Sequence, residues 1–230
     1  PHDGATLHWK TYLDNFLERH ADQVERLRDL FQRSVKDCPA TQCAMFYTMY
    51  GSFEEKNGLT KRALAVYHEM CQKVPVTEKL MAYQLYIVKA TKLLGMEATR
   101  DVYQEAVEVL NDSSSAKICI EFAEMEGKLK QFERARAIFA YGAQMADPRK
   151  IPEFWAAWKD FEISNGNENT FREMLRIKRA SEARFQSVNV SAVSQITGAL
   201  SEEDAMRMIA AQEGVHLDEI PQTGVSGFVA

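Results

Sequence analysis

The sequence predicts an all-α protein: an α–α superhelix, or solenoid, of five helix pairs followed by an irregular C-terminal tail. Two observations lead to this prediction. Aromatic residues recur every 36 positions over most of the 230-residue chain. The apolar residues between them are three and four positions apart, as on one face of a helix. One short helix pair cannot bury such a face alone, so successive pairs must stack.

The repeat is clearest in two columns of residues that lie 36 positions apart. The first column reads Tyr47, Tyr83, Cys119 and Trp155, and the second reads Tyr50, Tyr86, Phe122 and Trp158. An earlier repeat, with two extra residues, contributes Trp9 and Tyr12. Since only 10% of the chain is aromatic, this agreement indicates a true repeat. We expect the structural core of the repeats to contain Trp9, Tyr12, Tyr47, Tyr50, Tyr83, Tyr86, Phe122, Trp155, Trp158 and Phe161.

Each repeat divides into two helices joined by a turn. The first helix carries two aromatic residues, then an apolar residue and an acid, as in residues 155–162. The turn contains Gly or Asn, which are typical of a helix C-cap. The second helix has small residues before an aromatic, as in residues 134–139, and ends near Pro or Asn. Residues 7–186 should therefore be helical, with turns near 20–24, 38–42, 57–60, 74–78, 95–97, 111–115, 127–131, 147–152 and 165–168.

The acids at the end of the first helices recur with the repeat, as Glu54, Glu126 and Glu162. A residue that follows the architecture is best explained as structural, so we expect each to cap or pair with the neighbouring helix. The third repeat departs from this pattern, because Lys89 and Ala90 stand where an apolar residue and the acid are expected. We expect this change to weaken one helix face.

The net charge of −5 is unevenly distributed. Residues 187–230 contain Arg207 and six acids, whereas residues 1–186 contain 27 basic and 27 acidic residues. We therefore divide the chain into a solenoid, residues 1–186, and an acidic tail, residues 187–230. Residues 187–200 should be irregular or extended, and residues 201–213 should form a short helix that begins with Ser201 and three acids. The neutral body offers no bulk charge for long-range capture of nucleic acid.

No catalytic, metal-binding or cofactor-binding constellation is recognisable. The four cysteines have neither zinc-site spacing nor a disulfide framework, and we interpret them as reduced, structural residues. The five histidines show no metal-ligand spacing. The sequence therefore predicts a protein that is not an enzyme and has no cofactor.

A basic stripe on the last predicted helix is the candidate partner-binding site. It consists of Arg172, Arg176 and Arg179 at helical spacing, with Lys178 beside them. Two interpretations remain open: a solvated face that ends the solenoid, or a docking surface for an acidic partner or RNA.

The helix pair built on aromatic-x-x-aromatic-x-x-Phe-Glu and then Ala-Arg-x-Ile-aromatic resembles the HAT (half-a-tetratricopeptide) repeat, which is close to the tetratricopeptide repeat. Residues 147–179 look like the last repeats of the SYF-one / XPA-binding-protein-two family of pre-mRNA splicing factors. The resemblance covers about residues 7–186 and is most specific from 99 to 179. The resemblance implies the C-terminal part of a larger nuclear protein. Its partners would be splicing factors of the NineTeen-associated and intron-binding complexes, including other HAT-repeat proteins, with RNA contact secondary.

The function predicted from this resemblance is a non-catalytic protein–protein interaction scaffold of the spliceosome, acting in pre-mRNA splicing. One alternative is a HAT-repeat scaffold of another RNA-processing machine, in 3′-end cleavage or ribosome assembly. A second is a direct RNA-binding helical repeat, which would need polar readout residues that recur with the period. A co-chaperone that clamps peptide C-termini would need recurring basic residues on the groove-lining helices. Neither pattern is present in these columns.

Overall fold

The computed structural model describes residues 3–20 and 22–196, and within them every regular element is helical. The chain divides into two compact units, Pro1–Lys178 and Arg179–Ala230. The domain boundary expected after residue 186 stays a prediction, and the helix expected at 201–213 lies outside the described residues. The elements are α1 (Asp3–Arg19), α2 (Val24–Asp37), α3 (Cys43–Lys56), α4 (Thr60–Lys73), α5 (Lys79–Leu94), a 3-10 helix η1 (Glu97–Thr99), α6 (Arg100–Val109), α7 (Asp112–Lys128), α8 (Phe132–Gly142), α9 (Pro152–Asn165) and α10 (Glu168–Ile196).

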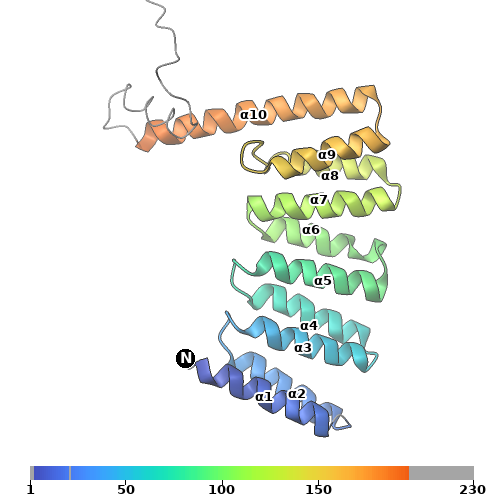
Figure 1. The fold of residues 1–230 in the computed structure, drawn as a ribbon, viewed down its shortest axis with the longest axis vertical. Coiled ribbons are helices and arrows are strands. Elements are labelled where there is room, and N and C mark those ends of the chain that lie inside the picture. The colour runs from blue at the N-terminus through green and yellow to red at the C-terminus, as the bar shows by residue number, and fades with distance from the viewer. Residues whose placement is uncertain (1–2, 21, 197–230) are drawn as a thin grey trace, which may run out of the picture. The chain divides into compact units, whose positions relative to one another are not determined.

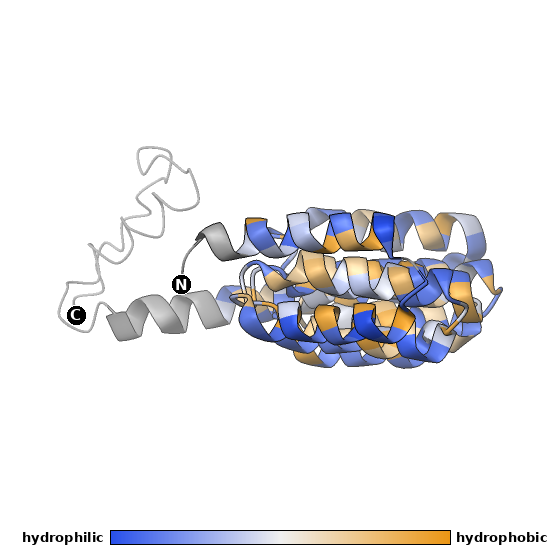
Figure 2. Ribbon diagram, turned by 90° about the horizontal axis from the view of Figure 1, so that it is seen from below, coloured by the Kyte–Doolittle hydropathy of each residue, from blue (hydrophilic) through white to orange (hydrophobic). Residues whose placement is uncertain are grey.

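In the first unit, α1 to α9 stack one on another (Figure 1). Each helix from α1 to α7 packs against the next, and α9 packs against α7 and, through Phe139 and Trp158, against α8. Hydrophobic and hydrophilic residues alternate along the visible helices, as expected for helices with a buried side (Figure 2). This arrangement confirms the predicted helical solenoid.

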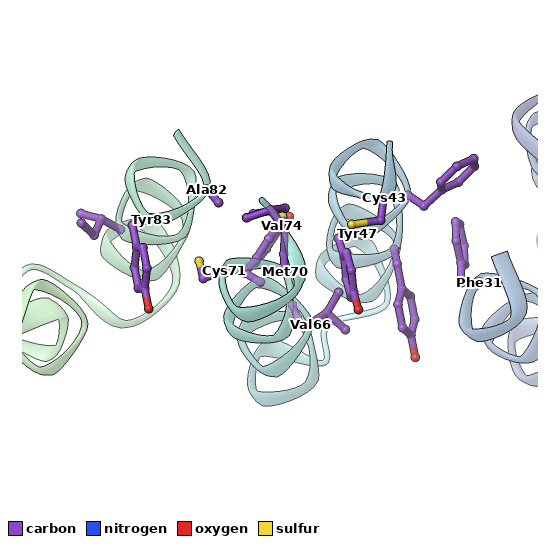
Figure 3. Close-up of a cluster of buried hydrophobic side chains, with 14 of the residues drawn as sticks. Phe31, Cys43, Tyr47, Val66, Met70, Cys71, Val74, Ala82 and Tyr83 are labelled. Carbon is purple, nitrogen blue, oxygen red and sulfur yellow. The ribbon is translucent and has the colours of Figure 1, made fainter. Parts of the chain in front are cut away.

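The core lies between successive helices. Figure 3 shows Tyr47 of α3, Met70 of α4 and Tyr83 of α5, all three of which are buried. The Tyr47 hydroxyl donates to Glu69 of α4, and the Tyr83 hydroxyl donates to Glu105 of α6. At three junctions between repeats, an aromatic ring of one second helix stacks on an aromatic ring of the next first helix. The stacked pairs, with their centroid separations, are Phe31–Tyr50 at 5.2 Å, Tyr103–Phe122 at 4.9 Å and Phe139–Trp158 at 5.5 Å.

Two predicted element boundaries differ from the structure. The turn expected at 111–115 is shorter, because α7 already begins at Asp112. Asn111 caps this helix, and its side-chain oxygen accepts a hydrogen bond of 2.9 Å from the Ser114 backbone N–H. The loop before α9 is longer than expected, because α8 ends at Gly142.

The prediction that residues 187–200 are irregular is wrong for residues 187–196, which continue α10. The segment is rich in Ser and Val, whose weak helix propensity suggested an extended chain. These preferences cost only about 0.5 kcal/mol per residue. No Gly or Pro occurs anywhere in Glu168–Ile196, so nothing in the sequence interrupts a helix that has already formed.

The expected glycine C-caps occur where the backbone needs them. Gly58 and Gly95 follow α3 and α5 with φ of +75° and +92°, a region that favours glycine. Lys130 occupies the corresponding place after α7, two periods beyond Gly58, with φ of +58°. A lysine is strained in this conformation.

Replacing Lys130 by glycine is expected to raise the free energy of unfolding by about 0.5 to 1 kcal/mol. Glycine has no Cβ, so the steric strain of the left-handed backbone is relieved, and the lysine side chain that is lost is exposed. Denaturant unfolding followed by circular dichroism measures the change. The matched control is Lys117→Gly at an exposed position inside α7, which should lower stability by about 1 kcal/mol. A loss of stability in Lys130→Gly would show that the left-handed conformation is not strained.

Candidate functional site: the repeat junctions and the last helix

The ten residues predicted to form the repeat core lie at three levels of exposure. Five are buried: Tyr47, Tyr50, Tyr83, Trp155 and Trp158. Four are partly buried and pack against the core: Trp9, Tyr86, Phe122 and Phe161. The expectation is wrong for Tyr12, which is 46% exposed. Tyr12 lies on α1, and no helix of the described chain precedes α1 to cover its ring.

Each predicted structural glutamate pairs with an arginine that lies 26 residues earlier, on the preceding helix. Arg28 donates to the Glu54 carboxylate through Nε at 2.7 Å and through its NH2 nitrogen at 2.9 Å. Arg100 holds Glu126 in the same way at 2.6 and 3.0 Å. Arg136 donates from Nε to both oxygens of Glu162 at 3.2 Å. We call these three contacts the inter-repeat ion pairs, and they confirm that the glutamates pair with a neighbouring helix.

The inter-repeat ion pairs are well removed from solvent. The side chains of Glu54, Glu126 and Glu162 are at most 1% exposed, whereas their arginines are 8 to 29% exposed. The hydrogen bond to Glu54 raises the pKa of Arg28, and the hydrogen bond to Glu126 does the same for Arg100. Bidentate geometry fixes the relative position of two helices as well as neutralising a buried charge.

The sequence predicted a structural role for the glutamates of these pairs but did not identify the arginines that bind them. The signal was available, since Arg28, Arg100 and Arg136 are separated by two periods and one period. Basic residues are common on exposed helix faces, and this made the arginine column look like ordinary surface.

The junction between α4 and α5 lacks an inter-repeat ion pair and shows what replaces it. At this junction the two positions of the pair are Leu64 and Ala90, and both side chains are buried. Both charges have therefore been exchanged together for apolar groups. A buried charge without a partner would be costly, but an apolar pair of this kind is not.

An ion pair next to this junction involves Lys89, the other unexpected residue of the third repeat. Lys89 Nζ lies 2.8 Å from Glu55 Oε1, and the Tyr67 hydroxyl donates to the same oxygen at 2.6 Å. Burial raises the pKa of Glu55, but the hydrogen bonds from Lys89 and Tyr67 outweigh it and leave that pKa lowered. This ion pair joins α5 to α3, and Tyr67 of α4 binds the same carboxylate, so a polar link spans the three helices.

The basic stripe is less cationic than its sequence indicates. Arg172 donates to Glu168 at 2.5 Å, and Arg176 donates to both oxygens of Glu173 at 2.6 and 2.9 Å. Lys178 is partly buried, and Arg179, in the second unit, is exposed. Because two of the arginines have acids on the same helix, the stripe does not present an unopposed array of positive charge to a phosphate backbone.

All four cysteines are free and buried. The described residues contain no group of three or more His, Cys, Asp and Glu side chains that could hold a metal ion. None of the helices in that part of the chain is long and apolar enough to cross a membrane.

Cys71 and Cys119 are expected to resist alkylation by iodoacetamide in the native protein at about pH 8, because thiolate is the reactive form. Burial raises the pKa of both thiols to about 12. Mass spectrometry of tryptic peptides after timed labelling measures the rates, and labelling in denaturant is the control, in which all four thiols should react alike. Fast native labelling of either thiol would contradict the buried placement.

Stacked helix pairs joined by recurring inter-helix ion pairs define an α-helical repeat protein, a class that acts by presenting extended surfaces to partners. The family described as pre-mRNA-splicing factor Syf1/CRNKL1 C-terminal HAT repeat matches residues 3–223. The chain therefore belongs to this family of HAT repeats.

Curated relatives agree with this assignment. The chain is similar to pre-mRNA-splicing factor SYF1 of Mycosarcoma maydis, with 42% identity over 193 residues that cover 83% of this chain and 18% of the relative. Human SYF1 is 40% identical over 180 residues, covering 78% and 21%. The Schizosaccharomyces pombe factor cwf3 is 41% identical over 181 residues, covering 78% and 23%. The chain thus spans only about a fifth of the length of these relatives.

Proposed function

We propose that this chain is a non-catalytic protein–protein interaction scaffold that acts in pre-mRNA splicing in the nucleus. The observation that carries the proposal is the family membership, since the relatives are named pre-mRNA-splicing factors. The fold supports it, because rigidly joined helix pairs offer long surfaces on which several proteins bind at once. The inter-repeat ion pairs account for the recurring charged residues as structural groups.

The partners that we propose are splicing factors of the NineTeen-associated and intron-binding complexes, including other HAT-repeat proteins. Direct RNA binding is a secondary role in this proposal. It is disfavoured because most repeat aromatics are buried or partly buried between helices, where they are not available to stack on bases. The local acids beside Arg172 and Arg176 disfavour it as well.

Affinity purification of the tagged protein from nuclear extract, followed by mass spectrometry, tests this proposal. Splicing factors of the two complexes should be recovered, and recovery should persist after ribonuclease treatment. Recovery of 3′-end cleavage or ribosome-assembly factors without splicing factors would overturn it. Loss of all partners after ribonuclease would instead favour an RNA-binding repeat.

A further inference from the structure

Three internal junctions of the solenoid, α2–α3, α6–α7 and α8–α9, share one composition. At each of them, a buried residue, the arginine of an ion pair and an aromatic ring face the next first helix. On α8 these are Ala135, Arg136 and Phe139, and they meet Trp158 and Glu162 of α9. The same relation holds between α2 and α3 and between α6 and α7. In these three junctions the receiving helix supplies an aromatic residue and, four positions later, a glutamate, whereas α5 has Ala90 at the position of the glutamate.

One full period later, the same positions fall on α10 as Phe171, Arg172 and Leu175. Ala135 and Phe139 are buried, whereas Phe171 and Leu175 are only partly buried and pack against the hydrophobic core that contains Trp155 and Trp158. The side chain of Arg172 is 71% exposed, compared with 17% for Arg136. Within the described residues, Arg172 has its local acid Glu168 but no carboxylate from a following helix.

At the repeat spacing, the chain does not supply the aromatic residue and the glutamate that Leu175 and Arg172 would meet. The residue 19 positions after Leu175 is Ser194, where the internal repeats have an aromatic, and the residue 26 positions after Arg172 is Gly198, where they have a glutamate. Residues 197–227 contain no aromatic residue at all. The sequence after Leu175 therefore lacks the aromatic residue and the glutamate at the spacings of the internal junctions.

We propose that the face of α10 formed by Phe171, Arg172 and Leu175 binds one helix of another protein, in the manner of the first helix of a further repeat. The proposal rests on the scaffold function above and names the chemistry of one partner. Its helix carries an aromatic residue that packs on Leu175 and, four positions later, a glutamate that takes both donors of Arg172. An apolar residue stands between them, three positions after the aromatic, as Phe161 does in α9.

Lys178 adds a further requirement on this partner helix. The equivalent residue on α8 is Gly142, and a Cβ there would lie 2.7 Å from the ring of Phe154, four positions before Trp158. With a lysine in place of this glycine, a ring at that point of the partner would clash. An acid would instead pair with the ammonium group. Counted from the aromatic residue, the partner helix therefore carries an acid four positions earlier, an apolar residue three positions later and a glutamate four positions later.

A second copy of this chain does not satisfy the requirement. The sequence holds three pairs with an aromatic residue followed four positions later by Glu: Tyr50–Glu54, Phe122–Glu126 and Trp158–Glu162. All three glutamates are buried in inter-repeat ion pairs, so none is free to bind another molecule.

The test uses the full 230-residue chain and a fluorescent, helix-stapled peptide with the sequence of residues 152–165 carrying Phe154→Glu. Fluorescence anisotropy should show saturable binding of one peptide per chain. Arg172→Glu should weaken binding by about tenfold or more, because a bidentate charged contact is lost. Arg134→Glu, the same charge change on an exposed residue of α8, should leave the affinity unchanged within about twofold.

Exchanging the two charges between the peptide and the chain tests whether Arg172 contacts the peptide glutamate directly. A peptide with Glu162→Arg should bind the Arg172→Glu chain more tightly than it binds the wild-type chain. A peptide with Trp158→Ala should bind the wild-type chain about tenfold more weakly than the parent peptide, because the aromatic contact with Leu175 is lost.

Several results would overturn the proposal. These are absence of saturable binding, an equal effect of Arg176→Glu and Arg172→Glu, or failure of the charge exchange. Displacement of the peptide by a single-stranded RNA oligonucleotide would identify RNA as the occupant instead, and Arg172-dependent dimers in ultracentrifugation would identify a second copy. None of these outcomes removes splicing factors from the affinity purification, so failure here is distinct from failure of the scaffold function.

Discussion

Replacing Glu54 by alanine is expected to lower the free energy of unfolding by about 3 to 5 kcal/mol. Glu54 is fully buried and is the carboxylate that holds both donors of Arg28, whose side chain is only 8% exposed. Without Glu54, the guanidinium keeps only Glu25, which is itself 84% exposed. A buried charge that loses its principal partner is the costly outcome, and urea unfolding followed by circular dichroism measures it.

The chain itself provides the matched control for this experiment. The double variant Arg28→Leu and Glu54→Ala copies the natural Leu64 and Ala90 of the junction between α4 and α5. Replacing both charges together should recover most of the lost stability. A double variant as unstable as Glu54→Ala would show that the ion pair stabilises this junction directly, beyond compensating two buried charges.

Replacing Trp158 by alanine is the second large effect that we expect, again about 3 to 5 kcal/mol. Trp158 is 3% exposed, stacks on Phe139 at 5.5 Å with an interplanar angle of 6°, and lies 5.8 Å from the ring of Trp155. Its indole N–H also donates to Glu162 Oε1 at 3.2 Å. The variant removes a core ring and a hydrogen bond to the last inter-repeat ion pair, and thermal unfolding followed by circular dichroism measures the loss.

Two further variants separate these contributions. Trp158→Phe keeps a stacked ring but has no N–H, so it should lose less stability than the alanine variant. Ile163→Ala removes a side chain of α9 that is 64% exposed, and it should change stability by less than about 0.5 kcal/mol. An unchanged melting temperature in Trp158→Ala would contradict its place in the core and revive a binding role for the ring.

The repeat columns allowed most of the fold to be predicted from the sequence. A 36-residue period fixes which residues share a helix face, so the buried positions of Tyr47, Tyr83 and Trp155 follow from spacing alone. Tyr12 is the exception. Burial of a repeat residue depends on the neighbouring repeat as well as on its own sequence, and within the described residues α1 has a neighbouring helix on one side only.

The junction chemistry was harder to predict. Each glutamate was recognisable because it follows an aromatic motif, but its arginine belongs to the previous repeat and to a different helix. The length of α10 was missed for another reason. Weak propensities near its C-terminal end suggested an interruption, although no residue there breaks a helix.

The basic stripe illustrates the limit of a linear pattern. Spacing placed Arg172 and Arg176 together, but Glu168 and Glu173, which neutralise them locally, stand at spacings of four and three on the same helix. The column position of Arg172 separates it from Arg176. Only Arg172 continues the series of Arg28, Arg100 and Arg136, and this membership distinguishes it from an ordinary surface charge.

The constant spacing of the inter-repeat ion pairs bears on how a chain of this kind gains or loses length. Excising residues 101–136, one whole period, would join Arg100 to Ala137 and set that arginine 26 positions before Glu162. The new junction would contain the same arginine, carboxylate and stacked rings as the old ones. Loss of a single residue within a helix would instead rotate every later side chain by about 100°. Whole-period duplications and excisions are therefore the changes in length that evolution, or a protein engineer, could make without rebuilding any junction.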